Sequence, residues 1–308
     1  MAVARLRVVV VGRGKLGRAW LGALRAAGVE VRSRAGRSVR GECLPDADLV
    51  ILAVRDDAVA TVAEVLAATL GSTRPCRAAV VHCAGRLGPE ALAALGARGV
   101  GVAKMHPLLA VADGRRAPPF AGAWLHVVGD ARACRVAARL ARRLGMRVWR
   151  AAEVDHVLYH AAAALLANGA AALGAVAADL LAAACGGAVT AGGARTFARM
   201  LGALLGSVAH NLTQVGLPGA LTGPVRRGDA AAVRAHLAVL DDVAPDAATL
   251  LRALVGAQLP LARALGAPAV GLEAIADALR HGGASPSAAS RRARAVGPFA
   301  RVKRPRLR

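Results

Sequence analysis

Two polar side chains, His160 and Asn168, lie in a segment that is otherwise rich in alanine and leucine. Their spacing is a little over two helical turns, so in a helix both lie on a similar side, with the small Ala164 between them. A histidine can give up a proton and an amide can orient a polar atom. The pair could therefore protonate and orient the oxygen or nitrogen of a C=O or C=N bond during hydride transfer. The alternative is that both are polar residues satisfied by hydrogen bonds at a seam between domains.

His106 is a further candidate for proton transfer. It precedes Pro107 at the end of an apolar run. Proline disfavours a helical continuation, so we expect His106 at the carboxyl end of a strand. Ligands bind at that edge in open α/β sheets, which makes His106 an alternative proton donor. The other interpretation is a loop histidine that is hydrogen-bonded to the backbone.

His156 and His160 have the spacing of a helical metal-binding pair. No third ligand is near them in the sequence and no Glu lies between them, so we expect no metal site.

Arg226 and Arg227 lie in the segment 220–229, which glycine and proline residues frame. A guanidinium group binds a carboxylate through paired hydrogen bonds, so Arg227 is our candidate for holding a substrate carboxylate. Both arginines could equally be solvated loop charges. Asp229 is expected to cap a helix that begins at Ala230, and Asp56 and Asp57 to cap a helix over 58–70.

A glycine-rich turn near the start of the chain predicts a nucleotide site. An apolar run over 6–11 leads into the pattern G-x-G-x-x-G and then into a helical stretch. The first glycine permits a tight turn, the second leaves room for a pyrophosphate and the third lets helix and strand pack closely. The helix N-terminus then offers free N–H groups to the phosphates. The expected cofactor-binding residues here are Gly12, Arg13, Gly14, Lys15, Leu16 and Gly17.

The end of the second expected strand favours NADP over NAD. An enzyme that uses NAD usually has Asp or Glu at this corner, where it accepts hydrogen bonds from the ribose 2′-hydroxyl. Here the corner holds Ser33 and Arg34, with Arg37 following, whereas Glu30 comes too early. Arginine can pair with a 2′-phosphate and serine can add a hydroxyl donor. Arginine is common throughout the chain, so its presence at this corner could also be chance.

The elements that must position these residues follow a simple order. Residues 5–150 alternate short apolar runs with helical stretches, the pattern of a parallel sheet covered by helices. The third run ends at Ala53 and Val54, which we expect beneath the ribose on the nicotinamide side. Expected strands are 6–11, 29–32, 49–54, 79–82, 100–103, 125–128 and 147–149, and expected helices in this part are 16–27, 58–70, 89–95 and 131–144.

The second half of the chain has long alanine- and leucine-rich helical stretches broken by glycine. We therefore predict an α/β Rossmann domain with a mostly parallel sheet over residues 1–150, followed by an all-α domain over 151–280. Residues 281–308 are rich in Gly, Ser and Pro and then strongly basic, which predicts a disordered tail.

Composition narrows the class of protein. The net charge of +22 invites a nucleic-acid interpretation. However, the arginines are spread along the chain outside the tail, and aromatic residues, on which single-stranded nucleic acids stack, make up only 2%. We expect no nucleic-acid role. We also expect no membrane span, because polar residues interrupt the apolar runs. The 5 cysteines are scattered without a C-x-x-C pair, which indicates reduced core residues in a cytoplasmic protein.

Several segments together resemble the Rossmann-like oxidoreductases whose C-terminal domain is catalogued as of unknown function. The segments are 12–17, Ser33-Arg34, 48–54 with Asp56-Asp57, 81–85, 106–108, 159–168 and 220–229. That family is related to pyrroline-5-carboxylate reductase, ketopantoate reductase, the β-hydroxyacid dehydrogenases and deazaflavin-dependent NADP reductases. The resemblance covers residues 5–260.

The resemblance implies a small-molecule substrate and a homodimer formed through the helical domain. Two positions depart from the family pattern: Ala84 stands where Ser is usual, and the helix near Pro245 is rich in alanine instead of aromatic residues. The β-hydroxyacid relatives carry a Lys on the interdomain helix, and this chain has none there, so their mechanism is not transferred. We expect an NADPH-dependent reductase of a small keto- or imino-acid. The alternative is a non-catalytic NADP(H)-binding sensor or partner-binding protein.

Overall fold

The computed structural model describes residues 6–36, 47–70, 77–151, 153–187 and 190–281. The chain forms two compact units, Met1–Asn168 and Gly169–Arg308. The division falls inside one long helix, α5 (His156–Ala184), so the first unit includes the first turns of that helix. Of the expected tail, residues 282–308 lie outside the described part of the chain.

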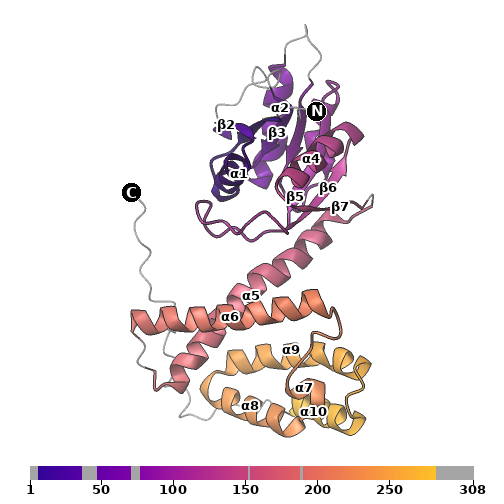
Figure 1. Ribbon diagram of the computed structural model, residues 1–308. Coiled ribbons are helices and arrows are strands. Elements are labelled where there is room, and N and C mark those ends of the chain that lie inside the picture. Colours follow the sequence, from indigo (N-terminus) through magenta and orange to yellow (C-terminus); the bar gives the residue numbers. More distant parts are fainter. Residues whose placement is uncertain (1–5, 37–46, 71–76, 152, 188–189, 282–308) are drawn as a thin grey trace. The chain divides into compact units, whose positions relative to one another are not determined.

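The first unit is built on a sheet with the strand order β2-β1-β3-β4-β5-β6-β7 (Figure 1). All pairs are parallel except β5 with β6, which confirms the predicted mostly parallel α/β sheet. The chain goes from β1 to β2 on one side and then returns to place β3 on the other side of β1. This reversal creates a crevice at the carboxyl ends of β1 and β3. The strands are β1 (Arg7–Val11), β2 (Glu30–Arg34), β3 (Leu49–Leu52), β4 (Ala79–His82), β5 (Gly101–Pro107), β6 (Trp124–Gly129) and β7 (Arg147–Trp149).

Helices cover both faces because successive residues of a buried strand point to opposite sides. On β1, Val8 and Val10 join the core under α1 (Lys15–Ala26) and α4 (Ala131–Arg143), while Val9 and Val11 join the core under α2 (Val59–Ala68) and α3 (Ala93–Gly96). Short 3₁₀ helices, η3 (Asp56–Ala58) and η4 (Pro89–Leu92), precede α2 and α3.

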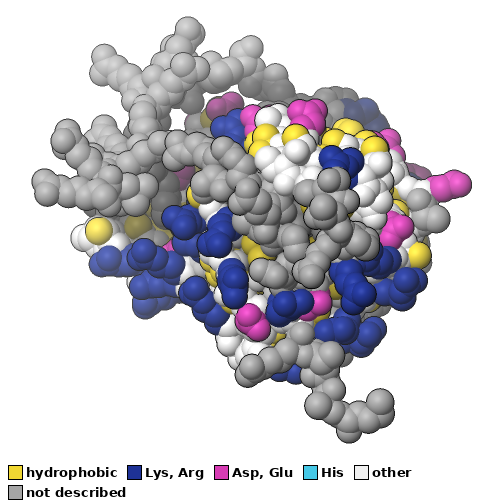
Figure 2. All heavy atoms as spheres, turned by 90° about the horizontal axis from the view of Figure 1, so that it is seen from above, with side chains coloured by type: hydrophobic (Ala, Val, Ile, Leu, Met, Phe, Trp, Pro, Cys, Tyr) yellow, Lys and Arg dark blue, Asp and Glu magenta, His cyan; other side chains and the backbone are white. Residues whose placement is uncertain are grey.

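Arginine side chains are exposed on the outer surface of this unit. On α4, Ala137 and Leu140 are buried, whereas Arg135, Arg139 and Arg142 are exposed. In Figure 2 the Lys and Arg side chains form several separate groups, with Asp and Glu between them.

Strand β5 is longer than the sequence predicted. It continues beyond Ala103 to Pro107 because β6 runs antiparallel beside it and pairs with its last residues, with His106 opposite His126. The predicted end at Ala103 is wrong, and His106 belongs to the strand.

The capping aspartates were predicted correctly in one place and wrongly in another. Asp229 caps α8 (Ala230–Val243) by accepting a hydrogen bond from the N–H of Ala232 at 3.0 Å. Asp56 and Asp57 do not cap α2. Asp57 instead binds the guanidinium of Arg55, and Asp56 forms an ion pair with Arg86 at 3.2 Å.

The second unit contains the rest of α5, α6 (Ala191–Gln214), α7 (Pro224–Arg227), α8, α9 (Pro245–Ala264) and α10 (Ala269–His281). Apolar side chains of α7 to α10 form its core, among them Val233, Leu237, Val255 and Ile275. By contrast, none of the α6 side chains is buried, and α5 buries only Ala178 and Ala182.

Within the described residues, α5 is the one helix that is long and apolar enough to cross a membrane by length and composition alone, with a mean hydropathy of 1.7. The described cysteines Cys83, Cys134 and Cys185 are free, but Cys185 is exposed, so the expected core position is wrong for it.

Candidate functional site

The glycine turn between β1 and α1 has the backbone geometry that the sequence predicted. Gly12 has φ of +117°, and a Cβ there would come within 2.3 Å of the carbonyl oxygen of Ala53. A Cβ at Gly17 would lie 2.1 Å from the carbonyl oxygen of Gly12, so this glycine lets α1 pack against the turn. A Cβ at Gly14 would meet no atom within 4 Å, which leaves its backbone open at the N-cap of α1.

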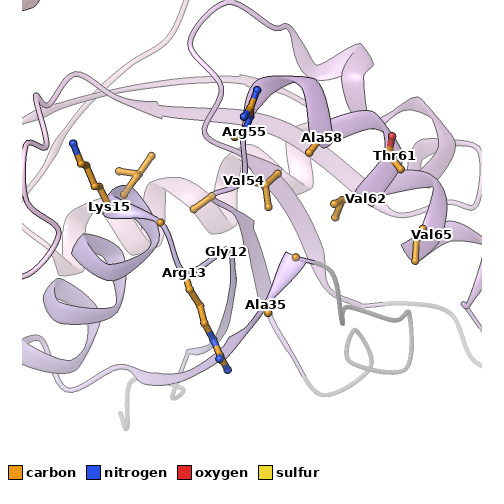
Figure 3. A pocket seen from close by; sticks show the side chains of 14 residues that line it. Gly12, Arg13, Lys15, Ala35, Val54, Arg55, Ala58, Thr61, Val62 and Val65 are labelled. Atoms are coloured by element: carbon orange, nitrogen blue, oxygen red, sulfur yellow. The ribbon is translucent and has the colours of Figure 1, made fainter. Parts of the chain in front are cut away.

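A pocket of about 830 Å³ opens at this turn. Its lining combines the turn and the start of α1 with the end of β2, the end of β3 and α2 (Figure 3). Arg13 and Lys15 extend in opposite directions from the turn, and Val54, Val62 and Val65 form an apolar wall. The pocket therefore joins a helix N-terminus, cationic side chains and an apolar surface.

These features fit a dinucleotide. The open backbone at Gly14 and the helix N-terminus suit a pyrophosphate, since such N–H groups and the helix dipole favour negative charge. The apolar wall suits a base or ribose face. Seven of the predicted cofactor residues line this pocket: Gly12, Arg13, Gly14, Lys15, Leu16, Ala53 and Val54.

The residues expected to select NADP lie at the border of this pocket. Ser33 and Arg34 end β2 beside Val10 and Val11, and the carbonyl of Arg34 accepts a hydrogen bond from the N–H of Gly12 at 2.9 Å. The Arg34 side chain is exposed, and the lining residues nearest to it in sequence are Ala35 and Gly36. Arg37 lies outside the described residues.

A second pocket, of about 420 Å³, brings the three predicted catalytic residues together. His106 from β5 and His160 and Asn168 from α5 all line it. The remaining walls are apolar, from the segment after β5 (Leu108–Val111) and from α5, including Ala163 and Ala164. We call this pocket the histidine cleft. It lies entirely within the first unit.

His106 is held as a neutral imidazole. Its Nδ1 lies 2.8 Å from the Tyr159 hydroxyl, and the two rings meet edge to face. Burial and the nearby charge of Lys104 lower the pKa of His106 to about 3. At neutral pH the ring can therefore accept or donate a hydrogen bond but carries no charge.

His160 faces His106 across a backbone segment without a side chain. The two imidazole rings are edge to face, with centroids 5.9 Å apart. A Cβ at Gly85 would lie 2.3 Å from the Nδ1 of His160 and 3.0 Å from the Nε2 of His106. The absence of a side chain at Gly85 is thus what allows both rings to approach this point.

Three side chains hold the loop after β4, which carries Gly85. His82 accepts a hydrogen bond at Nδ1 from the N–H of Ala84 and donates from Nε2 to the carbonyl of Gly88. Glu90 accepts a hydrogen bond from the N–H of Gly88 at 3.0 Å. Because both nitrogens of His82 are engaged in this way, its ring is neutral, and burial lowers its pKa to about 4.

Lys104 is the third of these side chains, and it is not among the site residues predicted from the sequence. It is fully buried, and its Nζ donates to the carbonyl of Gly85 at 2.5 Å and contacts the Nδ1 of His156 at 3.1 Å. Burial lowers its pKa to about 8. The available signal was composition: in a chain whose cations are nearly all Arg, a single Lys stands inside an apolar strand.

The two histidines of the possible metal pair point to different partners. His156 lies against Lys104, whereas His160 lies against Gly85 and His106. Among the described residues, no group of three metal-ligating side chains occurs. Arg227 ends α7 in the second unit, and its side chain is exposed.

Comparison with known proteins agrees with this arrangement. Residues 123–257, from the last strands of the sheet into α9, match the family model described as a domain of unknown function (DUF2520). The resemblance predicted from the motifs is thereby confirmed. No curated protein matches the sequence.

Solved structures share the fold. A putative NADP oxidoreductase from Bacteroides fragilis is 21% identical with a TM-score of 0.62, and a protein from Thermotoga maritima is 22% identical with a TM-score of 0.59. Each match covers 83% of this chain and 98% of the other chain. Pyrroline carboxylate reductase from Plasmodium falciparum, solved with NADP bound, is 11% identical with a TM-score of 0.56, over 85% of this chain and 98% of that one. At these identities the likeness establishes the Rossmann-type fold with its helical C-terminal region.

Proposed function

We propose that this protein is an NADP(H)-dependent oxidoreductase that reduces the C=O or C=N bond of a small, carboxylate-bearing substrate. The observation that carries the proposal is that one compact unit holds both a pocket suited to a dinucleotide and a cleft with His106, His160 and Asn168. The names of the B. fragilis and P. falciparum structures, which describe an NADP oxidoreductase and a reductase with NADP bound, support it.

Cofactor binding is assigned to the pocket at the glycine turn. The N–H groups at the start of α1 hold the pyrophosphate, and Arg13 and Lys15 add positive charge. Ser33 and Arg34 at the end of β2, with Arg37 after them, bind the 2′-phosphate and so favour NADP over NAD.

Substrate chemistry is assigned to the histidine cleft. The reduced nicotinamide, when bound, supplies the hydride. His160 donates the proton to the substrate oxygen or nitrogen, and the Asn168 amide orients that atom. His106 is the alternative donor. Its lowered pKa suits it better to a fixed, neutral hydrogen-bonding role beside His160. The remaining walls of the cleft are mostly apolar and would contact the non-polar part of a substrate.

We assign Arg227 to the binding of the substrate carboxylate, because a guanidinium group pairs well with a carboxylate. The free thiols of Cys83, Cys134 and Cys185 support a reducing compartment, and we propose the cytoplasm.

A single-turnover experiment tests the function. The protein is loaded with an equal amount of NADPH and mixed with a panel of 2-keto acids and cyclic imines, and the loss of NADPH absorbance is followed. We expect oxidation with at least one member of the panel. In His160→Ala the rate should fall about 10²- to 10⁴-fold, the range for loss of a proton-transfer group, while NADPH affinity stays unchanged.

The matched control is His236→Ala, which removes an exposed histidine from α8 in the other unit. It should behave like the wild type. NADPH binding without turnover, together with no effect of His160→Ala, would favour a non-catalytic NADP(H) sensor instead.

A further inference from the structure

Among the described residues, Lys104 is the one fully buried Lys or Arg side chain. Lys104 is fully buried in the middle of β5, although no carboxylate bonds to it among the described residues. A buried ammonium group is costly unless its N–H groups are satisfied.

The contacts of Lys104 lead to two groups that touch the cleft histidines, Gly85 and Tyr159. Its Nζ donates to the carbonyl of Gly85, the residue whose Cα separates His106 from His160. It also lies 4.8 Å from the ring centroid of Tyr159, whose hydroxyl bonds to His106. An ammonium group has only donors, so the Nδ1 of His156 accepts its third contact and the His156 proton resides on Nε2.

We propose that Lys104 is a positioning residue of the cleft: through Gly85, Tyr159 and His156 its ammonium group fixes the places of the His106 and His160 rings. The inference rests on the proposed function in one respect, since the fixed rings are those assigned to proton donation. Lys104 itself is buried and touches no lining atom that a substrate would meet directly, so its action is indirect.

The charge of Lys104 also acts on the imidazoles around it. Four histidines face it: His82 from β4, His106 from β5, His126 from β6 and His156 from α5. Their pKa values are lowered, first by burial and then also by the positive charge of Lys104. The carboxylates that act on Lys104 are those of Glu90 on η4 and Asp56 on η3, and both favour its charged form. These four neighbours are therefore neutral when Lys104 is charged.

Two substitutions separate the effects of charge and hydrogen bonding. Lys104→Met keeps the length of the side chain and removes both. Lys104→Gln removes the charge and keeps a donor for the Gly85 carbonyl. The matched control is Arg98→Met, which removes another cation that donates to backbone carbonyls, those of Ala67 and Leu70, away from the cleft.

Each variant is measured in three ways: histidine titrations by NMR, NADPH affinity and the single-turnover rate. In Lys104→Met we expect His156 and His106 to titrate at higher pH than in the wild type. We expect the reduction rate to fall about 10- to 100-fold, the range for a small misplacement of reacting groups, with NADPH affinity unchanged. Lys104→Gln should show the same titration shifts with a smaller loss of rate.

A purely structural role would lower the melting temperature without moving the histidine titrations or the rate, and that result in folded Lys104→Met would overturn the proposal. If no substrate is found, the proposed function fails, but the titrations still decide the inference. If neither variant folds, NMR titration of the wild-type lysine Nζ replaces them. The Lys104 signal should titrate at about 8, and the His156 signal should shift with the same midpoint. An unresponsive His156 would contradict the inference.

Discussion

Gly14 differs from Gly12 and Gly17 in what surrounds it, although all three belong to one turn. A Cβ at Gly12 or Gly17 would collide with backbone, whereas a Cβ at Gly14 would enter open space above the start of α1. These roles were predictable from the sequence because backbone geometry alone dictates them. The roles of Lys104 and Gly85 were not, because they depend on which side chains the sheet places beside β4 and β5.

The choice between NADP and NAD depends on one exposed side chain. Arg34→Asp replaces the cation at the end of β2 with a carboxylate. A carboxylate repels a 2′-phosphate and can accept a hydrogen bond from a 2′-hydroxyl. We expect NADPH affinity to fall about 10- to 100-fold, the loss of one or two charge-assisted hydrogen bonds, and NADH affinity to stay the same or rise. Fluorescence titration with both cofactors measures this.

The control for this prediction is Arg32→Asp, an exposed arginine on the same strand two positions earlier. Arg32→Asp should lower the affinities for NADPH and NADH slightly and by the same factor. If Arg34→Asp lowers NADPH and NADH affinity by the same factor, the assignment of the 2′-phosphate to Arg34 is wrong.

At the scale of elements, all seven expected strands are present, because buried apolar runs between helical stretches are typical of a covered parallel sheet. The predictions were wrong where contacts with residues distant in sequence determine the structure. Strand β5 extends to Pro107 because β6 pairs with it antiparallel, a pairing that periodicity does not reveal. Asp56 and Asp57 bind Arg86 and Arg55 instead of the helix terminus, which a local capping rule cannot foresee.

The burial of histidines in these strands predicts acid instability. Burial lowers the pKa of His82 and of His126 from 6.5 to about 4. Between these values the unfolded chain binds more protons than the folded one, so stability is full above pH 6.5 and is lost as the pH falls toward about 4. The melting temperature should fall steeply across this window.

The variant His126→Phe measures the contribution of His126 to the acid instability. Among the described residues neither ring nitrogen of His126 has a hydrogen-bond partner, and the ring lies against Trp149 and Tyr159. Phenylalanine should keep the packing and make the loss of melting temperature with falling pH shallower, whereas His236→Phe at an exposed position serves as the control. If the melting temperature of His126→Phe falls as steeply with decreasing pH as that of the wild type, His126 does not contribute to the acid instability.

At the scale of the whole molecule, the helical unit exposes apolar side chains on α6. Met200, Leu204 and Leu205 are exposed by 54%, 62% and 48%, and no α6 residue is buried. Exposed apolar side chains that lie close together on a helix are a common feature of interaction sites. From this surface and the family resemblance we propose that two copies of the chain associate through the helical domain.

Leu204→Glu tests this proposal. A charge placed within an apolar interface should convert a dimer to a monomer, as measured by light scattering after gel filtration. Arg234→Glu on α8, another exposed helical position of the same unit, should leave the mass unchanged. A monomeric wild type, or wild type that sediments with membranes, would contradict dimerisation through this surface.

The central claim is that a cofactor held at the glycine turn delivers hydride to a substrate in the histidine cleft. The most direct test is a single turnover with NADPH that carries deuterium at the reactive carbon of the nicotinamide, prepared separately for each face, followed by mass spectrometry of the product. The claim predicts a product with one deuterium from one face only, and little product in His160→Ala. Bound NADPH that transfers no deuterium to any keto acid or imine of the panel would contradict it.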